Sequence, residues 1–204
     1  MSSRNEILAR IKAATPPPEN RVALPEYRDE QILSLPHLEG DDLWKIFSRN
    51  FSAVSGRTMT SVNALATFLL ERELTTGYCD PEWMKRVGQP LEKAGLIVET
   101  KFDRSRYDDY QFGITRATGA IAESGSLVLD DELTSDRLAA LSPWVHVAIL
   151  NRRDLIRTIP DAIGKFGNCP NIIWATGPSK TADVEGILIE GVHGPGEQIA
   201  LMLR

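Results

Sequence analysis

The chain has 204 residues and a formal net charge of −5, and 25% of its residues are charged. This length suffices for one domain, or for one domain with an arm. The core of such a domain is large enough to be stable without disulfide bonds. The acidic balance argues against a large nucleic-acid-binding surface, which would need clustered basic side chains. No segment approaches the roughly 18 apolar residues of a membrane-spanning helix.

The N-terminal segment predicts a short helix followed by an extended arm. Ile7, Leu8 and Ile11 recur at helical spacing, with charged residues between them that are unlike a signal peptide. The run "TPPPE" then ends the helix, because proline lacks the N–H group that the helix needs. We therefore expect residues 1–40 to form an N-terminal helix and a proline-rich arm, and residues 41–204 to form the folded domain. A soluble, cytoplasmic protein is expected.

The first part of the domain predicts short helices and strands in alternation. Asp41 or Asp42 can cap a helix, and the pair Asp80-Pro81 is a second start signal. A strand is expected in "RTMTSV", a helix in "NALATFLLEREL", and another strand in "LIVET".

The second part continues the pattern with more hydrophobic strands. The β-rich runs are "GSLVLD", "WVHVAIL" and "NIIWA", and "RRDLIRTIPDAIGKF" between the last two is predicted to be helical. The tail, "ILIEGVHGPGEQIALMLR", predicts two strands around a glycine loop. Strands that alternate with helices of this length are typical of a mostly parallel sheet covered on both faces. The predicted fold class is α/β.

The loop "TGPSKTADVEG" is a candidate anion-binding loop. Gly177 permits close approach of the backbone, Ser179 and Thr181 offer hydroxyl groups, and Lys180 adds a positive charge. The Walker pattern is absent. The alternative is a tight turn whose hydroxyls only cap the chain that follows.

A second candidate is the segment "GITRATGAIAESGS". Glu123 beside a glycine turn could serve as a nucleophile or general base, or it could be an ordinary surface glutamate at the entrance of a strand. Thr115 and Arg116 just upstream could supply further contacts to an anion.

The third candidate is the loop "GVHGPG". His193, next to Gly194, could project into a cleft or could be a structural hydrogen-bonding residue. His146 lies inside an apolar run and is expected in the core. No group of histidine, cysteine and acidic residues has the spacing of metal ligands, so no metal site is predicted. The two cysteines, Cys79 and Cys169, are expected to be free thiols in a reducing compartment.

Taken in order, "GITRATGAIAESGSLV", "TGPSKTADVEG" and "GVHGPG" closely resemble the LUD-domain family, in its lactate utilization protein C group. The family pattern usually has arginine where Lys180 stands and threonine where Ser124 stands. Lysine keeps the charge, but it cannot bind a carboxylate or phosphate through two parallel hydrogen bonds as arginine does.

The resemblance implies a three-layer α/β fold similar to the sugar-phosphate isomerases and CoA transferases. It also implies a role in bacterial oxidation of L-lactate to pyruvate, beside partner proteins that carry iron–sulfur clusters. Two distant cysteines cannot hold a cysteine-ligated cluster, so this chain is expected to be the non-cluster subunit, without a cofactor of its own. The alternative is an enzyme or binder that acts on a sugar phosphate, a carboxylate or a CoA ester. Whether the chain is catalytic is left open.

The three loops also lead to a geometric prediction. A single site requires the segments 113–126, 176–183 and 191–196 to meet at one edge of the sheet. Glu123, Lys180 and His193 are then expected to line one cleft, with backbone N–H groups of residues 177–181 facing it.

Overall fold

The computed structural model describes residues 3–15, 38–130, 136–169, 171–182 and 187–203. The chain divides into two units, residues 1–35 and residues 36–204. The first contains the predicted helix, α1 (Ser3–Ala14), while residues 16–37 of the predicted arm lie outside the described residues. The division at residue 40 stays a prediction. Residues 38–40 belong to the second unit, where Arg157 donates to the carbonyl oxygens of Leu38 and Gly40.

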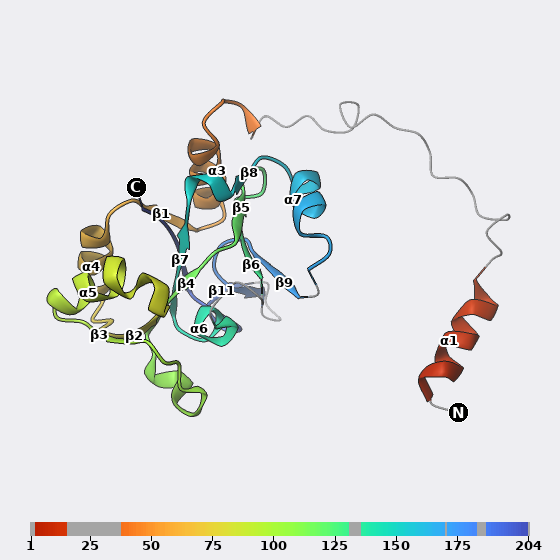
Figure 1. Cartoon of the computed structure of the whole chain (residues 1–204), viewed down its shortest axis with the longest axis horizontal. Helices are drawn as coiled ribbons and strands as arrows, with labels where there is room; N and C mark the ends of the chain where they lie inside the picture. Colours follow the sequence, from red (N-terminus) through yellow and green to blue (C-terminus); the bar gives the residue numbers. More distant parts are fainter. Residues whose placement is uncertain (1–2, 16–37, 131–135, 170, 183–186, 204) are drawn as a thin grey trace. The chain divides into compact units, whose positions relative to one another are not determined.

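The second unit is built on a six-stranded parallel sheet in the order β1-β12-β7-β4-β2-β3 (Figure 1). Its strands are β1 (Arg57–Met59), β2 (Thr76–Cys79), β3 (Ile97–Glu99), β4 (Phe112–Arg116), β7 (Val145–Leu150) and β12 (Glu197–Met202). Every pair in this sheet is parallel. The α/β class and the mostly parallel sheet are therefore confirmed.

Helices cover both faces of this sheet. Helices α4 (Val62–Leu70) and α5 (Gln89–Lys93) form the main core with one face of the strands. Helix α6 (Arg137–Leu141) packs against β4 and β7. It can lie this close because Gly113 has no side chain, and a Cβ atom there would collide with the carbonyl oxygen of Ala139.

A second sheet, in the order β8-β5-β6-β9, lies on the side of the first sheet opposite α4 and α5 (Figure 1). Its strands are β5 (Gly119–Ile121), β6 (Ser126–Asp130), β8 (Leu155–Ile156) and β9 (Ile172–Ala175), and α7 (Ile159–Phe166) packs on it. Helix α3 (Leu43–Ala53) contacts both β1 and β8. A separate hairpin consists of β10 (Lys180–Ala182) and β11 (Leu188–Glu190).

Short helical turns also lie among the described residues of this unit. They are η3 (Pro81–Trp83), η4 (Met84–Gly88), η5 (Arg104–Asp109) and η6 (Arg152–Asp154). Among the helices of the described residues, none has both the length and the apolar character needed to cross a membrane.

Two local expectations differ from the structure. The helix predicted over residues 152–166 is wrong in its first half, where the chain forms η6 and β8 and the helix begins only at Ile159. The reason is a capping box in which Thr158 and Asp161 exchange hydrogen bonds. Strand β2 was not expected from its short sequence, "TGYC".

Candidate functional site

The order of the strands marks one position where a ligand site is favoured. The chain passes from β2 outward to β3, then returns to form β4 on the other side of β2. Such a reversal is a topological switch point, and ligands of open α/β sheets bind beyond the carboxyl ends of the strands there. Asp80, which follows β2, and Arg116, which ends β4, occupy this position.

We call Asp80, Glu82 and Arg116 the β2/β4 edge. Asp80 is buried, and its carboxylate accepts the N–H of Glu82 at 2.8 Å. The side chain of Arg116 is 29% exposed and lies 3.9 Å from the Glu82 carboxylate. Sequence reasoning singled out Arg116 but treated Asp80 only as a helix cap and passed over Glu82. Because strand β2 was not expected, nothing in the sequence placed Asp80 and Glu82 at the end of a strand.

Thr115, although adjacent to Arg116, belongs to the core. Its hydroxyl lies 2.9 Å from Nε2 of His146, and Nδ1 of His146 lies 2.8 Å from Oε1 of Gln198. Because the amide oxygen of Gln198 can only accept, His146 donates from Nδ1 and accepts from the Thr115 hydroxyl at Nε2. Burial lowers the pKa of His146 to about 4. The histidine is therefore a neutral core residue, as its apolar run indicated.

Glu123 is bound to the start of a helix. Its carboxylate accepts the N–H of Ile159, the first residue of α7, at 2.6 Å. Its backbone is held as well, since its N–H donates to the carbonyl of Arg157 and its carbonyl accepts from Asn50. A carboxylate at a helix N-terminus stabilises the helix by pairing an otherwise unsatisfied N–H. This geometry favours a structural role for Glu123.

The loops around residues 176–181 and 191–196 are joined by backbone hydrogen bonds. The N–H of Ser179 donates to the carbonyl of Pro195, and the N–H of Gly191 donates to the carbonyl of Ser179, both at 2.9 Å. Gly194 lies against Ser179 as well. Since these bonds use the Ser179 N–H, that group is not available to an anion.

This pair of loops lies at the amino edge of the parallel sheet, the edge at which its strands begin. The second loop runs directly into the start of β12, where Glu197 donates to the carbonyl of Trp144, the residue before β7. Sequence reasoning placed the loop after a strand, beside the carboxyl ends. The structure places it before β12, at the end of the sheet opposite Arg116.

Helix α3 packs against the remaining parts of the predicted site. Gly177 has φ of +78°, and a Cβ atom there would collide with the carbonyl oxygen of Val54. The segments around residues 113–126 and 176–183 do meet, because the hydroxyls of Ser126 and Thr176 lie 2.7 Å apart. Asn50 on α3 reaches the same turn through the carbonyl of Ala122. The end of α3 therefore covers the place where the two segments join.

Lys180, Thr181 and His193 lie toward the hairpin. The ammonium group of Lys180 is 3.0 Å from the Ser55 hydroxyl and 3.3 Å from the Glu190 carboxylate. Thr181 pairs with Ile189 in the hairpin, and His193 is exposed. Among the hydrogen bonds of the described residues, none joins Glu123 to Lys180 or to His193.

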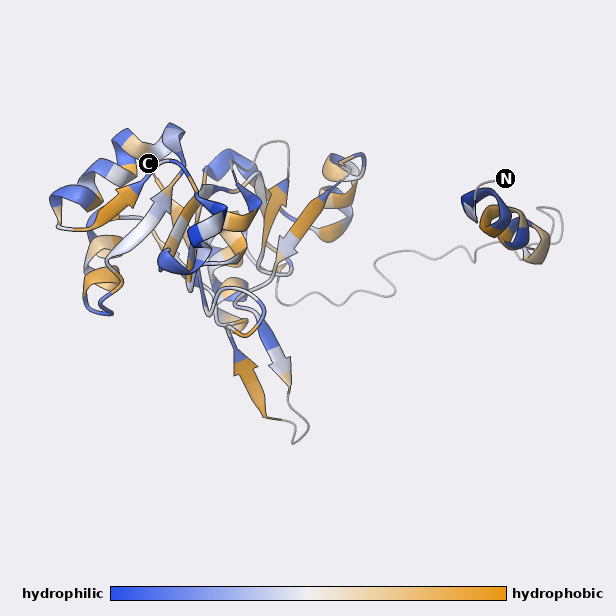
Figure 2. Ribbon diagram, turned by 90° about the horizontal axis from the view of Figure 1, so that it is seen from below, coloured by the Kyte–Doolittle hydropathy of each residue, from blue (hydrophilic) through white to orange (hydrophobic). Residues whose placement is uncertain are grey.

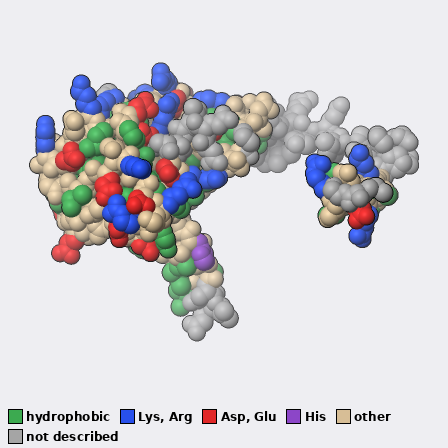
Figure 3. All heavy atoms as spheres, turned by 60° about the horizontal axis from the view of Figure 1, so that its bottom comes forward, with side chains coloured by type: hydrophobic (Ala, Val, Ile, Leu, Met, Phe, Trp, Pro, Cys, Tyr) green, Lys and Arg blue, Asp and Glu red, His purple; other side chains and the backbone are tan. Residues whose placement is uncertain are grey.

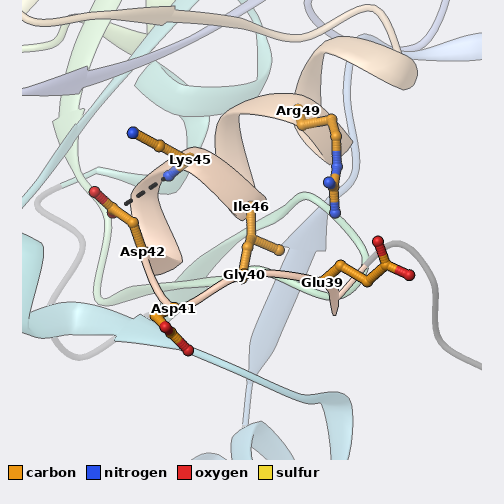
Figure 4. Close-up of a pocket in the computed structure, with 7 residues that line it drawn as sticks. All are labelled: Glu39, Gly40, Asp41, Asp42, Lys45, Ile46 and Arg49. Atoms are coloured by element: carbon orange, nitrogen blue, oxygen red, sulfur yellow. Dashed lines mark hydrogen bonds between the residues drawn. The ribbon is translucent and has the colours of Figure 1, made fainter.

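A surface depression of about 440 Å³ lies at the start of α3 (Figure 4). Its lining carries acidic and basic side chains together: Glu39, Asp41, Asp42, Lys45 and Arg49, with Ile46. Burial raises the pKa of Asp42, but hydrogen bonds from the N–H groups of Trp44 and Lys45, and the charge of Arg152, together lower it. The Asp42 carboxylate therefore serves as the N-cap of α3.

The described residues contain no cluster of three or more histidine, cysteine or acidic side chains that could hold a metal ion. Cys79 and Cys169 are both free. Burial raises the pKa of the Cys79 thiol to about 12, and the Cys169 thiol donates to Asp130 at 3.2 Å. A thiol with so high a pKa is a poor nucleophile and a poor metal ligand.

Comparison with known proteins decides the family. The LUD domain matches residues 85–203, which include β4, β7, β12 and both loops of the amino edge. The chain belongs to the LUD domain family. Within the family, a solved structure of a DUF162 family protein from Deinococcus radiodurans has the same fold. That structure gives a TM-score of 0.57 at 15% identity and covers 79% of this chain and 96% of its own.

Several curated relatives carry the name Lactate utilization protein C. The relative from Deinococcus radiodurans is 29% identical over 105 residues, covering 49% of this chain and 50% of its own. The one from Bacillus subtilis is 34% identical over 91 residues, covering 41% of this chain and 38% of its own. This chain thus spans half or less of their length. An uncharacterized protein from Neisseria meningitidis is 24% identical and covers 100% of this chain and 94% of its own.

Proposed function

We propose that this LUD-domain protein takes part in lactate utilization as a subunit without an iron–sulfur cluster, beside partner proteins that carry clusters. The observation that carries the proposal is the similarity to proteins named Lactate utilization protein C within the matched domain. The free, distant cysteines fit a subunit that leaves electron transfer to a partner.

We place the anion-binding function of this subunit at the β2/β4 edge. Lactate and pyruvate are carboxylates at neutral pH, and a guanidinium group binds a carboxylate through two parallel hydrogen bonds. Arg116 combines this chemistry with the switch point of the sheet and with partial exposure. Its ion pair with the exposed Glu82 is long, and an exposed pair of this kind contributes little to stability.

The amino edge supports anion binding less well. Lys180 already contacts Glu190 and Ser55, so a ligand would have to compete with both. The backbone N–H of Ser179 is bonded within the protein. Thr181 lies within a paired strand.

A second candidate function is binding or conversion of a sugar phosphate, a carboxylate or a CoA ester by this chain alone. The depression at the start of α3 favours it, because its volume of about 440 Å³ is in the range of small-molecule sites. Lys45 and Arg49 would contact the anionic group there. The three nearby carboxylates offset much of this positive charge, so we rank this candidate second.

Gene deletion in the native host tests the first proposal. We expect loss of growth on L-lactate with unchanged growth on glucose, and restoration by the wild-type gene but not by Arg116→Ala. A matched control, Arg104→Ala, changes an arginine outside the β2/β4 edge and should restore growth. Unchanged growth of the deletion strain on lactate would contradict the role in lactate utilization. Full restoration by Arg116→Ala would contradict only the site.

Affinity purification of the tagged protein from lactate-grown cells tests the partners separately. We expect an iron–sulfur protein to be retained in stoichiometric amount, detected by its visible absorption and iron content. Recovery of this chain alone, under conditions where growth depends on it, would exclude a stable complex.

A further inference from the structure

The hairpin formed by β10 and β11 is the feature of the described residues that the proposed function leaves unused. Its two strands project from the body of the α/β domain (Figure 2). They form a sheet of their own, joined to neither of the two larger sheets. An isolated two-stranded hairpin is only marginally stable in water, so a projecting one needs further contacts.

The hairpin carries an exposed apolar surface (Figures 2 and 3). Leu188 is 60% exposed and Ile189 is 40% exposed, although they point to opposite faces of the strand. Ile187, Val192 and Trp144 are likewise exposed. These five side chains together expose on the order of 500 Å² of surface, spread over the two faces of β11 and the base of the hairpin, and exposed apolar surface of this extent is often an interaction site.

Trp144 makes this surface continuous with the base of the hairpin. A Cβ atom at Gly191 or Gly196 would meet its indole ring, so the ring packs over both glycines. The apolar surface therefore extends from the free strand to the amino edge of the parallel sheet. We define the hairpin surface as Trp144, Ile187, Leu188, Ile189 and Val192.

Strand β11 also has an open edge. In the described part of the chain it pairs only with β10. Natural proteins protect open edges with charges, prolines or bulges, but of the three residues in β11 only Glu190 is charged. Glu190 is moreover neutralised by Lys180 in the same hairpin.

We propose that the hairpin surface is a homodimer interface, in which the β11 edges of two copies pair antiparallel about a two-fold axis. A two-fold axis perpendicular to β11 relates the β11 strands of two copies so that they run antiparallel. The same residues then form the interface in both copies. Because Lys180 and Glu190, the charged residues of the two strands, pair within each copy, they do not repel the second copy. The apolar area of the hairpin surface is a large part of the roughly 800 Å² that each partner of a standard interface buries.

Sedimentation velocity of the full chain over about 1–100 µM tests the dimer. We expect wild-type protein to move from monomer to dimer with concentration, and Ile189→Lys to raise the dissociation constant at least about tenfold, because the two introduced charges face each other across the two-fold axis. Ile97→Lys is the matched control, because Ile97 is 58% exposed on the edge strand β3. It should leave the dimer intact. Val192→Lys provides a second test if Ile189→Lys fails to fold.

Disulfide trapping tests the pairing of the strands. Ile189 is the central residue of β11, so Ile189→Cys should form a covalent dimer under mild oxidation, while Ile97→Cys should remain monomeric on a non-reducing gel. A wild-type chain that stays monomeric at all concentrations overturns the proposal. So does a dimer that Ile189→Lys and Val192→Lys leave unchanged, or a hairpin surface that binds only a different protein.

Discussion

The carboxyl edge and the amino edge of the six-stranded sheet both hold a cation beside a glutamate, but the two cation–glutamate pairs differ in length. At the carboxyl edge, Arg116 lies 3.9 Å from Glu82 in a long ion pair. At the amino edge, Lys180 contacts both Glu190 and Ser55 at 3.3 and 3.0 Å. The backbone around Lys180 is also bonded to a neighbouring loop through Ser179.

The comparison teaches that a glycine- and hydroxyl-rich loop need not bind an anion. In this protein such a loop uses its glycine to approach α3, and the N–H and carbonyl groups of Ser179 to bind a second loop. The edge that fits ligand binding better has a less conspicuous sequence, an arginine at the end of a strand and acidic residues after another. Substitutions at the two edges are expected to separate a structural role at the amino edge from the proposed binding role at the carboxyl edge.

Replacing Gly177 tests whether the amino-edge loop is structural. We expect Gly177→Ala to lower the free energy of unfolding by about 3 kcal/mol, because alanine is strained at this φ and its Cβ would collide with Val54. Urea denaturation measures the change. Gly164→Ala is the matched control. It has open space in α7, and we expect it to stabilise the protein by about 0.5–1 kcal/mol. A Gly177→Ala protein of wild-type stability would show that the loop is not packed as described.

His146, buried between the two edges and hydrogen-bonded to Thr115 and Gln198, predicts a pH dependence of stability. Because the folded-state pKa is about 4, below the value of 6.5 for an exposed histidine, the unfolded chain binds the proton first as pH falls. The stability contribution is constant above about pH 6.5. On the order of 3 kcal/mol is lost as the pH falls toward 4.

Urea denaturation at several pH values, with two variants, assigns this loss to His146. We expect His146→Gln to flatten the pH dependence between pH 6.5 and 4. The exposed His193→Ala should leave it unchanged. An equal pH dependence in wild type and His146→Gln would remove His146 as its source.

Replacing Glu123 tests whether its carboxylate has a structural role. We expect Glu123→Ala to cost about 1 kcal/mol of unfolding free energy, since it removes the partner of the Ile159 N–H at the start of α7. Ligand affinity should stay at the wild-type value. Loss of activity without loss of stability would instead assign Glu123 to catalysis.

Features governed by local chemistry could be predicted from the sequence. Asp42 caps α3 and Asp80 caps the turn that begins with Pro81, as their residue types indicate. Strands β6 and β7 were recognisable because each contains a run of consecutive apolar residues, which is typical of a strand buried on both faces.

Features governed by tertiary contacts could not be predicted from the sequence. The four residues of β2 form a strand because they pair with β3 and β4, and the ring of Phe112 covers Gly77. The glycine loop at 191–196 was predicted to follow a strand on the ligand-binding edge. Nothing in its own residues reveals that β12, the strand it precedes, places it at the opposite edge.

The most direct test of the assignment to the β2/β4 edge is calorimetric titration of L-lactate and pyruvate into three proteins. The account predicts binding by wild type and by Lys180→Ala, and at least about a tenfold loss of affinity in Arg116→Ala, because a paired guanidinium–carboxylate contact contributes about 1.5–3 kcal/mol. Lys180→Ala should change stability by less than about 1 kcal/mol, as expected for an exposed ion pair. Loss of binding in Lys180→Ala, with Arg116→Ala binding as tightly as wild type, would contradict the account and return the site to the amino edge.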